Sequence, residues 1–347
     1  MSHFKKLIII RPDDWHVHLR EGELLKCVIK SSTRVIGKCI VMPKLKIPIT
    51  TSSLCEKYKK EIRELAGTDY FTPYIPCYLT ENLNLNDFNF ALQENIFIGA
   101  KLYPSGATTN SNYGINNIEN TFPALELLIK HNKPLLIHGE KNAEGINLFD
   151  REKEFIDNDL SKIISKFPSL KIVLEHVSSK YGADFINDTN NLVGTITPHH
   201  MLLTKKDVFN GYINGHHYCM PIVKEEEDLL ALREYACSGN DKFFIGTDSA
   251  PHKIQHKQDT KNIKPGIFSA PCSIELYAEI FDQENALLNL EKFTSINGSK
   301  FYGLKSNFDK IELIKKEWIV DEHTTNNNII VKNFYGGKKL NWQIRNI

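Results

Sequence analysis

The sequence predicts an α/β fold, a (β/α)8 barrel of the TIM type with a small C-terminal β extension. Along its 347 residues, short apolar runs alternate with longer stretches whose apolar residues recur at helical spacing. The short runs are almost continuously apolar, which is typical of parallel strands covered by helices. Eight of them are expected to form strands, at residues 7–18, 39–43, 71–79, 97–103, 134–139, 171–177, 192–198 and 243–248. A doubly wound sheet is the competing fold, but no G-x-G-x-x-G motif follows the first run.

Helices are expected between these strands, and the tail differs from the rest. The helical stretches lie at residues 53–65, 122–131, 150–167 and 224–237. After about residue 304 the alternation ends, and three short apolar runs predict an appended β layer. Because no linker or internal repeat divides the sequence, we expect residues 1–347 to form a single domain, with residues 305–347 as that layer.

The composition excludes several classes of function. With 41% hydrophobic and 24% charged residues and a formal net charge of +1, the chain has no general attraction for nucleic acid or an anionic membrane. The apolar run at residues 7–10 is too short for a signal peptide or a membrane span. Seven scattered cysteines without a C-x-x-C motif argue against a disulfide framework and a cysteine zinc site, and indicate the reducing cytoplasm.

Two histidines near the N-terminus provide the first chemical motif. A strand places alternate side chains on one face, so His16 and His18 are expected to point at the same spot. Further candidate ligands stand at the ends of later strands, namely His138, His176 and Asp248. In a TIM barrel these ends meet at one mouth, where imidazole and carboxylate groups suit a divalent metal. The pattern therefore predicts a metal site with room for two ions.

Lys101 stands among these ligands although an ammonium group does not bind metals. A lysine buried in low dielectric loses its proton more readily, and the free amine reacts with carbon dioxide to give a carbamate. The carbamate has two anionic oxygens and can bridge two cations. The alternative is that Lys101 extends along a surface to solvent, as most lysines do.

Ten sequence blocks, taken together in this order, resemble the dihydroorotases of the amidohydrolase superfamily, in the shorter, bacterial-type class. They are residues 11–20, 41–43, 100–104, 107–110, 137–140, 149–152, 175–176, 197–198, 218–221 and 246–252. The resemblance extends to about Leu304 and weakens in the tail. It implies a small-molecule enzyme and a homodimer. The implied reaction is the reversible cyclisation of N-carbamoyl-L-aspartate to L-dihydroorotate in pyrimidine biosynthesis.

The resemblance also implies a role for each ligand and a cofactor of two Zn²⁺ ions per subunit. One ion is expected on His16, His18 and Asp248, and the other on His138 and His176. Lys101, as N6-carboxylysine, and a hydroxide would bridge the two ions. Asp248 would act as general base and then as general acid.

Substrate contacts follow from the same resemblance. Arg20 and His252 are expected to bind the substrate carboxylate, and Thr108 and Thr109 belong to a flexible loop over the site. Main chain at Met220, Pro265 and Gly266 is expected to contact the ring amides. One departure stands out: Lys44 occupies a position where the family commonly has asparagine, and we hypothesise a charged contact with the carboxylate.

Some expectations concern neighbours of these residues. By strand alternation, Glu140 and Glu175 should face away from the ligands beside them. His199 and His200 are either supporting residues of the site or core. The loops at residues 104–120 and 252–268 are long enough to be lids, although a disordered insertion is an equal alternative for the second.

Two rival functions remain at this point. One is another cyclic-amide hydrolase of the superfamily, such as a hydantoinase or dihydropyrimidinase, which shares the metal chemistry but not the carboxylate-binding Arg20. The other is a catalytically inactive barrel that serves as a structural partner. Such chains lose metal ligands, and this sequence retains all six.

Overall fold

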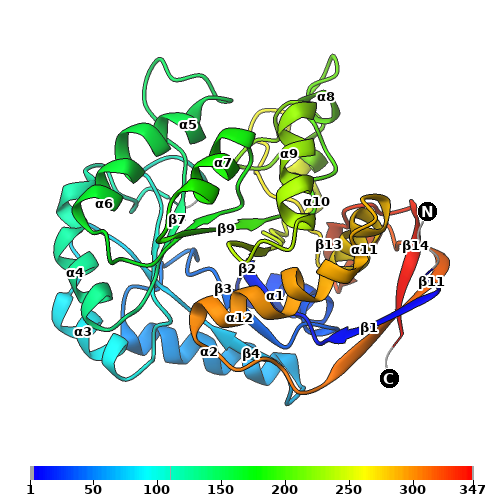
Figure 1. Ribbon diagram of the computed structural model, residues 1–347, viewed down its shortest axis with the longest axis horizontal. Helices are drawn as coiled ribbons and strands as arrows, with labels where there is room; N and C mark the ends of the chain where they lie inside the picture. Colours follow the sequence, from blue (N-terminus) through cyan, green and yellow to red (C-terminus); the bar gives the residue numbers. More distant parts are fainter. Residues whose placement is uncertain (1–3, 110, 346–347) are drawn as a thin grey trace.

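The computed structural model describes residues 4–109 and 111–345. At its centre, short parallel strands are surrounded by helices (Figure 1). The strands of the barrel are β2 (Asp14–Val17), β3 (Lys38–Val41), β4 (Thr72–Tyr74), β5 (Cys77–Tyr78), β6 (Ala100–Leu102), β7 (Leu135–His138), β8 (Ile172–Glu175), β9 (Leu192–Ile196) and β10 (Phe243–Ile245). The predicted (β/α)8 barrel is thus confirmed.

The barrel is assembled from two parallel sheets, β2-β3-β4 and β5 to β10 in sequence order. The interruption between β4 and β5 contains Pro76, which has no N–H to donate to a neighbouring strand. The other seam joins the first strand to the last. There the Asp248 N–H donates to the His16 carbonyl over 2.9 Å, and the His18 N–H donates to the Ser249 carbonyl over 3.0 Å. Closing the barrel therefore brings His16 and His18 next to Asp248.

Helices cover the outside of the barrel, as the apolar spacing predicted. The longer ones are α1 (Gly22–Thr33), α2 (Ser52–Ala66), α3 (Leu85–Gln93), α4 (Phe122–Lys130), α7 (Lys180–Asp188), α9 (Glu226–Cys237) and α11 (Ser273–Gln283). The predicted helix at 150–167 is α5 (Arg151–Phe155) and α6 (Ser161–Lys166), joined by a π-helical turn, η2 (Ile156–Leu160). Shorter elements are η1 (Ile118–Thr121), α8 (Lys205–Val208), η3 (Gly215–His217), α10 (Ile254–Gln258), η4 (Leu287–Asn289), the π-helical η5 (Lys292–Ile296) and α12 (Asn297–Tyr302).

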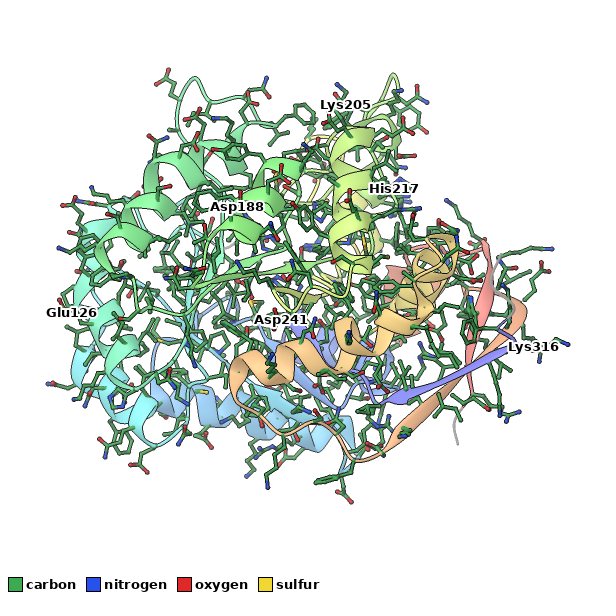
Figure 2. The ribbon with its side chains drawn as sticks, viewed as in Figure 1. Glu126, Asp188, Lys205, His217, Asp241 and Lys316 are labelled. Atoms are coloured by element: carbon green, nitrogen blue, oxygen red, sulfur yellow. The ribbon has the colours of Figure 1, made fainter. Side chains whose placement is uncertain are left out.

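The boundaries of α2 illustrate why these stretches are helices. The Thr51 side chain accepts a hydrogen bond from the Leu54 N–H and so caps the N-terminus. Gly67 ends the helix at φ 59°, a conformation that glycine adopts without steric cost. Exposed charges such as Glu126 and Lys316 point outward from the molecule (Figure 2).

The expectation of one strand over residues 7–18 is wrong. This segment forms two strands, because Pro12 separates β1 (Lys6–Ile10) from β2 and lacks the N–H of a strand interior. β1 lies outside the barrel and pairs antiparallel with β11 (Lys310–Ile319). Its position on the outer layer leaves Ile8 46% exposed, whereas Trp15 of β2 is completely buried.

The C-terminal segment forms a β layer beside α11 (Figure 1). A three-stranded sheet has the order β1-β11-β14, with β14 at Lys339–Arg345, and a hairpin is formed by β12 (His323–Asn326) and β13 (Ile329–Lys332). Trp342 of β14 is fully buried, and its indole N–H donates to Asp282 of α11 over 3.1 Å. Within the described part of the chain, no helix combines the length and apolar character needed to cross a membrane.

Candidate active site

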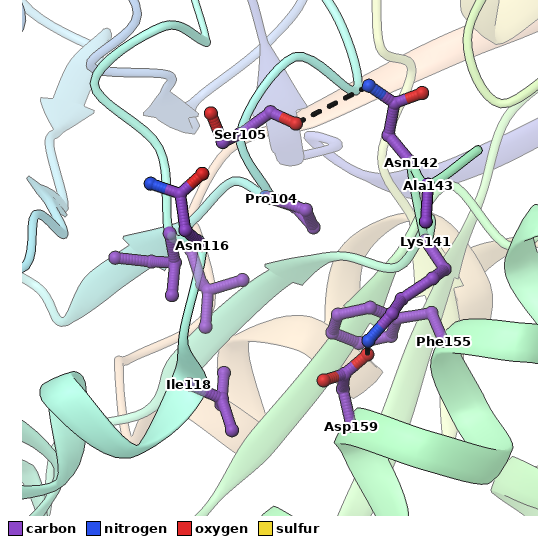
Figure 3. A pocket seen from close by; sticks show the side chains of 11 residues that line it. Pro104, Ser105, Asn116, Ile118, Lys141, Asn142, Ala143, Phe155 and Asp159 are labelled. Atoms are coloured by element: carbon purple, nitrogen blue, oxygen red, sulfur yellow. Dashed lines mark hydrogen bonds and ion pairs between the residues drawn. The ribbon is translucent and has the colours of Figure 1, made fainter.

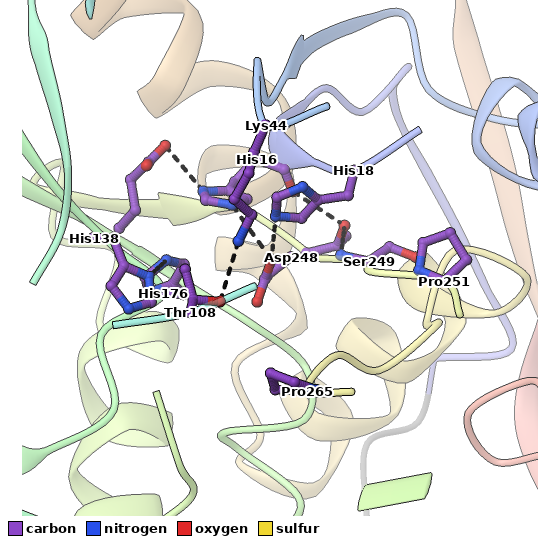
Figure 4. A network of polar contacts seen from close by, with 12 residues as sticks. His16, His18, Lys44, Thr108, His138, His176, Asp248, Ser249, Pro251 and Pro265 are labelled. Atoms are coloured by element: carbon purple, nitrogen blue, oxygen red, sulfur yellow. Dashed lines mark hydrogen bonds and ion pairs between the residues drawn. The ribbon is translucent and has the colours of Figure 1, made fainter. Parts of the chain in front are cut away.

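The predicted metal ligands converge at the carboxyl ends of the barrel strands (Figure 4). They come from β2, β6 and β7, from the residues that directly follow β2 and β8, and from the third residue after β10. All of them are buried: His16, His18, Lys101, His138, His176 and Asp248. These side chains come from five separate parts of the sequence; barrel closure places the four histidines and Asp248 around one cavity, and Lys101 contacts Glu175 beside it.

Backbone geometry at two of the ligands breaks the strand alternation. His176 has φ 44° and Asp248 has φ 43°, a left-handed conformation that is uncommon for residues other than glycine. As a result, Glu175 and His176 both point into the barrel. Glu175 contacts the Lys101 amine, and its Oε1 lies 3.0 Å from His16 Nδ1. The expectation that Glu175 faces away from the ligands is therefore wrong.

The same expectation is wrong for Glu140. β7 ends at His138, so strand alternation no longer applies two residues later. Glu140 Oε2 lies 2.7 Å from His138 Nε2 and is buried with it. A carboxylate in this place orients the imidazole, as carboxylates often do behind metal-binding histidines.

The ligand atoms are spaced as a metal ion requires. His16 Nε2 and His18 Nε2 lie 3.3 Å and 3.2 Å from Asp248 Oδ1. Elsewhere in the cavity, His138 Nδ1 lies 3.2 Å from His176 Nε2. Two ligands about 2.0 Å from a tetrahedral zinc ion are about 3.3 Å apart, so these separations fit a shared cation. Both ring nitrogens of His16 and Nδ1 of His176 are buried without a hydrogen bond of normal geometry.

The ionisation of Asp248 and His176 suits metal binding, whereas Glu175 and Asp248 outweigh burial and raise the pKa of His16. Burial raises the pKa of Asp248, but hydrogen bonds from His16 and His18 outweigh it and hold that pKa well below its usual range. Burial lowers the pKa of His176 well below its usual value, which favours the neutral imidazole that binds metals. Burial also lowers the pKa of Lys101, although Glu175 opposes this shift.

A second buried group, His199, His200 and Cys219, also brings potential ligand atoms together. His200 already has partners for both ring nitrogens, at 2.8 Å to Thr197 Oγ1 and 3.0 Å to the Pro221 carbonyl. The Cys219 thiol donates to the same carbonyl over 3.2 Å. We therefore assign His200 to the core, whereas both ring nitrogens of His199 are buried without a hydrogen-bond partner and its alternative stays open.

Basic side chains gather beside the metal ligands. Arg20 Nη2 lies 3.2 Å from His252 Nε2, and Arg20 Nε donates to the Pro251 carbonyl over 3.0 Å. Lys44 is only 6% exposed and donates to Thr108 Oγ1 over 3.1 Å, so it faces the pocket and not solvent. Burial, together with the charge of Arg20, lowers the pKa of Lys44 to about 7. Arg20, Lys44 and His252 also line an outer cavity of about 300 Å³.

The comparisons with known proteins agree with this geometry. The model of the amidohydrolase family matches residues 8–338. A dihydroorotase of Aliivibrio fischeri is 42% identical over 98% of this chain and 99% of its own length, and one of Hahella chejuensis is 42% identical over 97% and 98%. The chain belongs to the amidohydrolase family, among its dihydroorotases.

Solved structures in this family show the same fold. The dihydroorotase of Saccharomyces cerevisiae, in complex with 5-fluoroorotic acid, superposes with a TM-score of 0.92 at 32% identity and covers 99% of both chains. The dihydroorotase of Campylobacter jejuni gives a TM-score of 0.87 at 35% identity over 98% of this chain and 97% of its own. An L-hydantoinase of Arthrobacter aurescens, at 16% identity and a TM-score of 0.80, covers 97% of this chain and 82% of its own and shares the fold alone.

The loop at residues 104–120 contributes to the wall of the pocket. A β-bridge between Pro104 and Ile115 closes the stem of the loop. Thr108 and Thr109 line the inner pocket, which is the cavity lined by the four histidines and Asp248. Asn110 lies outside the described residues. Beneath the stem is a separate cavity of about 180 Å³ (Figure 3). Asn142 contacts the Ser105 carbonyl at the rim of this cavity.

The loop at residues 252–268 is ordered, so the alternative of a disordered insertion is wrong. It contains α10, and Lys257 within that helix is buried. His252 Nε2 lies 2.9 Å from the Pro265 carbonyl, and the Gly266 N–H donates to the Tyr218 carbonyl over 2.9 Å. Pro265, Gly266 and Met220 all line the inner pocket beside the metal ligands.

Sequence reasoning missed Tyr103 and Lys257. Tyr103 lines the inner pocket, and strand alternation from Lys101 would have identified it. Lys257 stands in a polar run, Lys253 to Gln258, where nothing distinguishes it from the exposed residues on either side. Lys257 differs from its neighbours because its ammonium group donates hydrogen bonds to the backbone carbonyls of Tyr218, Lys264 and Gly266.

Proposed function

We propose that this protein catalyses the reversible cyclisation of N-carbamoyl-L-aspartate to L-dihydroorotate, a step of pyrimidine biosynthesis. The observation that carries this proposal is the position of buried Lys44 and half-buried Arg20, which line the inner pocket together with the metal ligands, while half-buried His252 contacts Arg20. Such a site can hold the carboxylate of a substrate while its cyclic amide lies against the metal ligands. The dihydroorotase relatives, similar over almost their whole length, support the same reaction.

The metal centre proposed here contains two Zn²⁺ ions. His16, His18 and Asp248 would hold one ion, and His138 and His176 the other. Bound there, the ions supply a Lewis acid that polarises the amide carbonyl and lowers the pKa of water towards neutrality. Burial of the ligands and the close approach of His16 Nε2 and His18 Nε2 to Asp248 Oδ1 support this assignment.

Lys101 would join the two ions as a carbamate. Its neutral amine forms a bond to the carbon of CO₂ and releases one proton, which leaves two anionic oxygens in place of an ammonium group. The inward orientation of Lys101, its complete burial and its lowered pKa support this modification. Glu175, which contacts the unmodified amine, would then support His16.

Asp248 would move the proton of the reaction. During ring opening its carboxylate takes a proton from the attacking water, the water oxygen bonds to the amide carbon, and the bond from that carbon to the ring nitrogen breaks. Asp248 then gives its proton to the departing nitrogen, and ring closure reverses these steps. Its low pKa keeps the carboxylate ionised at the start of ring opening.

The rest of the pocket would bind and enclose the substrate. Arg20, His252 and Lys44 would contact the carboxylate, and main chain at Met220, Pro265 and Gly266 would face the ring amides. The inner cavity of about 10 Å³ is smaller than the ring, and the loop that carries Thr108 and Thr109 would move to admit substrate. Their return would exclude bulk water.

We further propose that the protein acts as a homodimer in the cytoplasm on small molecules, without nucleic acid or membrane partners. The cysteines support a reducing compartment, because all seven are buried and free. The homodimer follows from the family resemblance.

One experiment separates this function from its alternatives. Ring-opening rates are measured with dihydroorotate, hydantoin and dihydrouracil, together with metal content, before and after chelation. We expect turnover of dihydroorotate alone, abolished by chelation and restored by Zn²⁺. Equal or faster turnover of the uncharged rings would favour a hydantoinase-like enzyme, and metal-free protein without activity would favour an inactive barrel.

A further inference from the structure

Lys257 has an unusual environment for a lysine. Its side chain is only 5% exposed, and its Nζ donates hydrogen bonds to the carbonyls of Tyr218, Lys264 and Gly266 over 2.9, 2.9 and 2.6 Å. An ammonium group has three donors, so all of them are used by main-chain carbonyls. These backbone contacts offset part of the cost of burying the charge, and burial still lowers the pKa of Lys257 to about 7.

The carbonyls belong to two segments that form one wall of the pocket. Tyr218 stands two residues before Met220, and Gly266 follows Pro265. The Gly266 N–H also donates to the Tyr218 carbonyl, so Lys257 and this hydrogen bond connect the same two segments. α10 also packs closely against the chain just before Tyr218, because a Cβ at Gly215 would lie 1.9 Å from the Lys257 carbonyl.

We propose that Lys257 is a positioning residue, which holds the main chain at Met220 and at Pro265–Gly266 in the arrangement that receives the ring amides of the substrate. Without the cation, the carbonyls of Tyr218 and Gly266 converge with no donor between them, and the two segments separate. Lys257 does not line the pocket and acts only through these segments. The inference rests on the proposed function, because that function defines the ring amides.

The chain provides a matched control in Lys242. Its Nζ donates to the carbonyls of Ile186, Asn187 and Thr189 over 3.1, 2.6 and 2.8 Å. Lys242 directly precedes β10 and therefore lies at the end of the barrel opposite to the ligands. It makes the same kind of contact without any connection to the pocket.

The test compares Lys257→Met with Lys242→Met in the metal-loaded protein. Both variants are expected to unfold at lower temperature than wild type. Lys257→Met should raise KM for dihydroorotate about tenfold and change kcat less than about threefold, because uniform binding is lost. Lys242→Met should leave KM and kcat unchanged, and both variants should retain wild-type metal content. Lys257→Gln, which keeps a hydrogen-bond donor, should give an intermediate KM.

Several results would overturn the inference. They are an unchanged KM in Lys257→Met, an equal rise of KM in Lys242→Met, or loss of metal from Lys257→Met. If Lys257→Met does not fold, Lys257→Gln decides by the same criteria. Failure of both to fold, while Lys242→Met folds, would also contradict the inference, since Lys257 would then serve folding as a whole. Wild-type protein without turnover would instead overturn the proposed function.

Discussion

Lys44 Nζ donates a hydrogen bond to Thr108 Oγ1 over 3.1 Å, and so connects the segment after β3 to the loop over the pocket. The same ammonium lies 4.9 Å from the centre of the Tyr103 ring. One cation therefore faces both the proposed carboxylate site and the loop that carries Thr108.

Replacing Lys44 tests its contact with substrate. We expect Lys44→Asn to raise KM for dihydroorotate about fivefold, because a hydrogen bond from a charged donor is worth about 1 kcal/mol more than a neutral one. Steady-state kinetics measure the change, and Lys46→Asn, at an exposed neighbour, is the control. An unaltered KM in Lys44→Asn would show that the lysine does not contact the carboxylate.

The lowered pKa of Lys44 predicts a pH dependence of substrate binding. Lys44 is charged below its pKa of about 7 and neutral above it, so KM for dihydroorotate should rise as pH increases through 7. Lys44→Asn should lack this rise. A KM profile identical in both proteins from about one pH unit below that pKa to about one unit above it would contradict the prediction.

Stability should also depend on Lys44, with a sign that follows from the same shift. Its pKa falls from 10.5 in the unfolded chain to about 7 in the folded protein. Between these values the unfolded state binds more protons, so the free energy of unfolding should increase with pH across this window. Denaturant titrations should show a smaller increase for Lys44→Asn than for wild type.

Removing metal ligands should abolish activity without unfolding the barrel. We expect His16→Ala and His138→Ala to lower kcat by about 10³-fold or more, because a bound cation supplies several kcal/mol of transition-state stabilisation. Metal analysis should show reduced zinc in both. Asp248→Asn should lower kcat by about 10²–10⁴-fold through loss of proton transfer. Near wild-type turnover in any of the three would disprove its assigned role.

The C-terminal layer should contribute to stability and not to chemistry. Trp342 is fully buried against α11, so Trp342→Ala should cost about 3–5 kcal/mol of unfolding free energy. Lys316→Ala, at an exposed position of β11, should change it by less than about 0.5 kcal/mol. KM of the folded Trp342→Ala protein should match wild type, and an altered KM would show that the layer shapes the pocket.

Much of the barrel and the grouping of its ligands could be predicted from local sequence. Apolar runs define the strands, and parallel strands carry the residues at their carboxyl ends to one edge. His16 and His18 needed only strand alternation, and Asp248 only its place after the last strand. The structure brings them together as that argument requires.

Other features depend on conformation or on distant partners, which local patterns do not contain. The direction of the Glu175 side chain follows from the positive φ of His176, and the sequence has no glycine beside His176 that would predict a left-handed conformation there. The pairing of β1 outside the barrel depends on β11, far along the chain. Lys257 binds carbonyls, which every residue has, so its partners leave no pattern in the sequence.

The pairing of β1 with β11 has a consequence for biosynthesis. Ile9 lies opposite Ile311 in that sheet, so its partner leaves the ribosome about 300 residues later. At about 5–20 residues per second, the nascent chain would carry residues 6–10 without their partner strand for ~15–60 s. Chaperone protection of the growing polypeptide would therefore matter most for this short N-terminal segment.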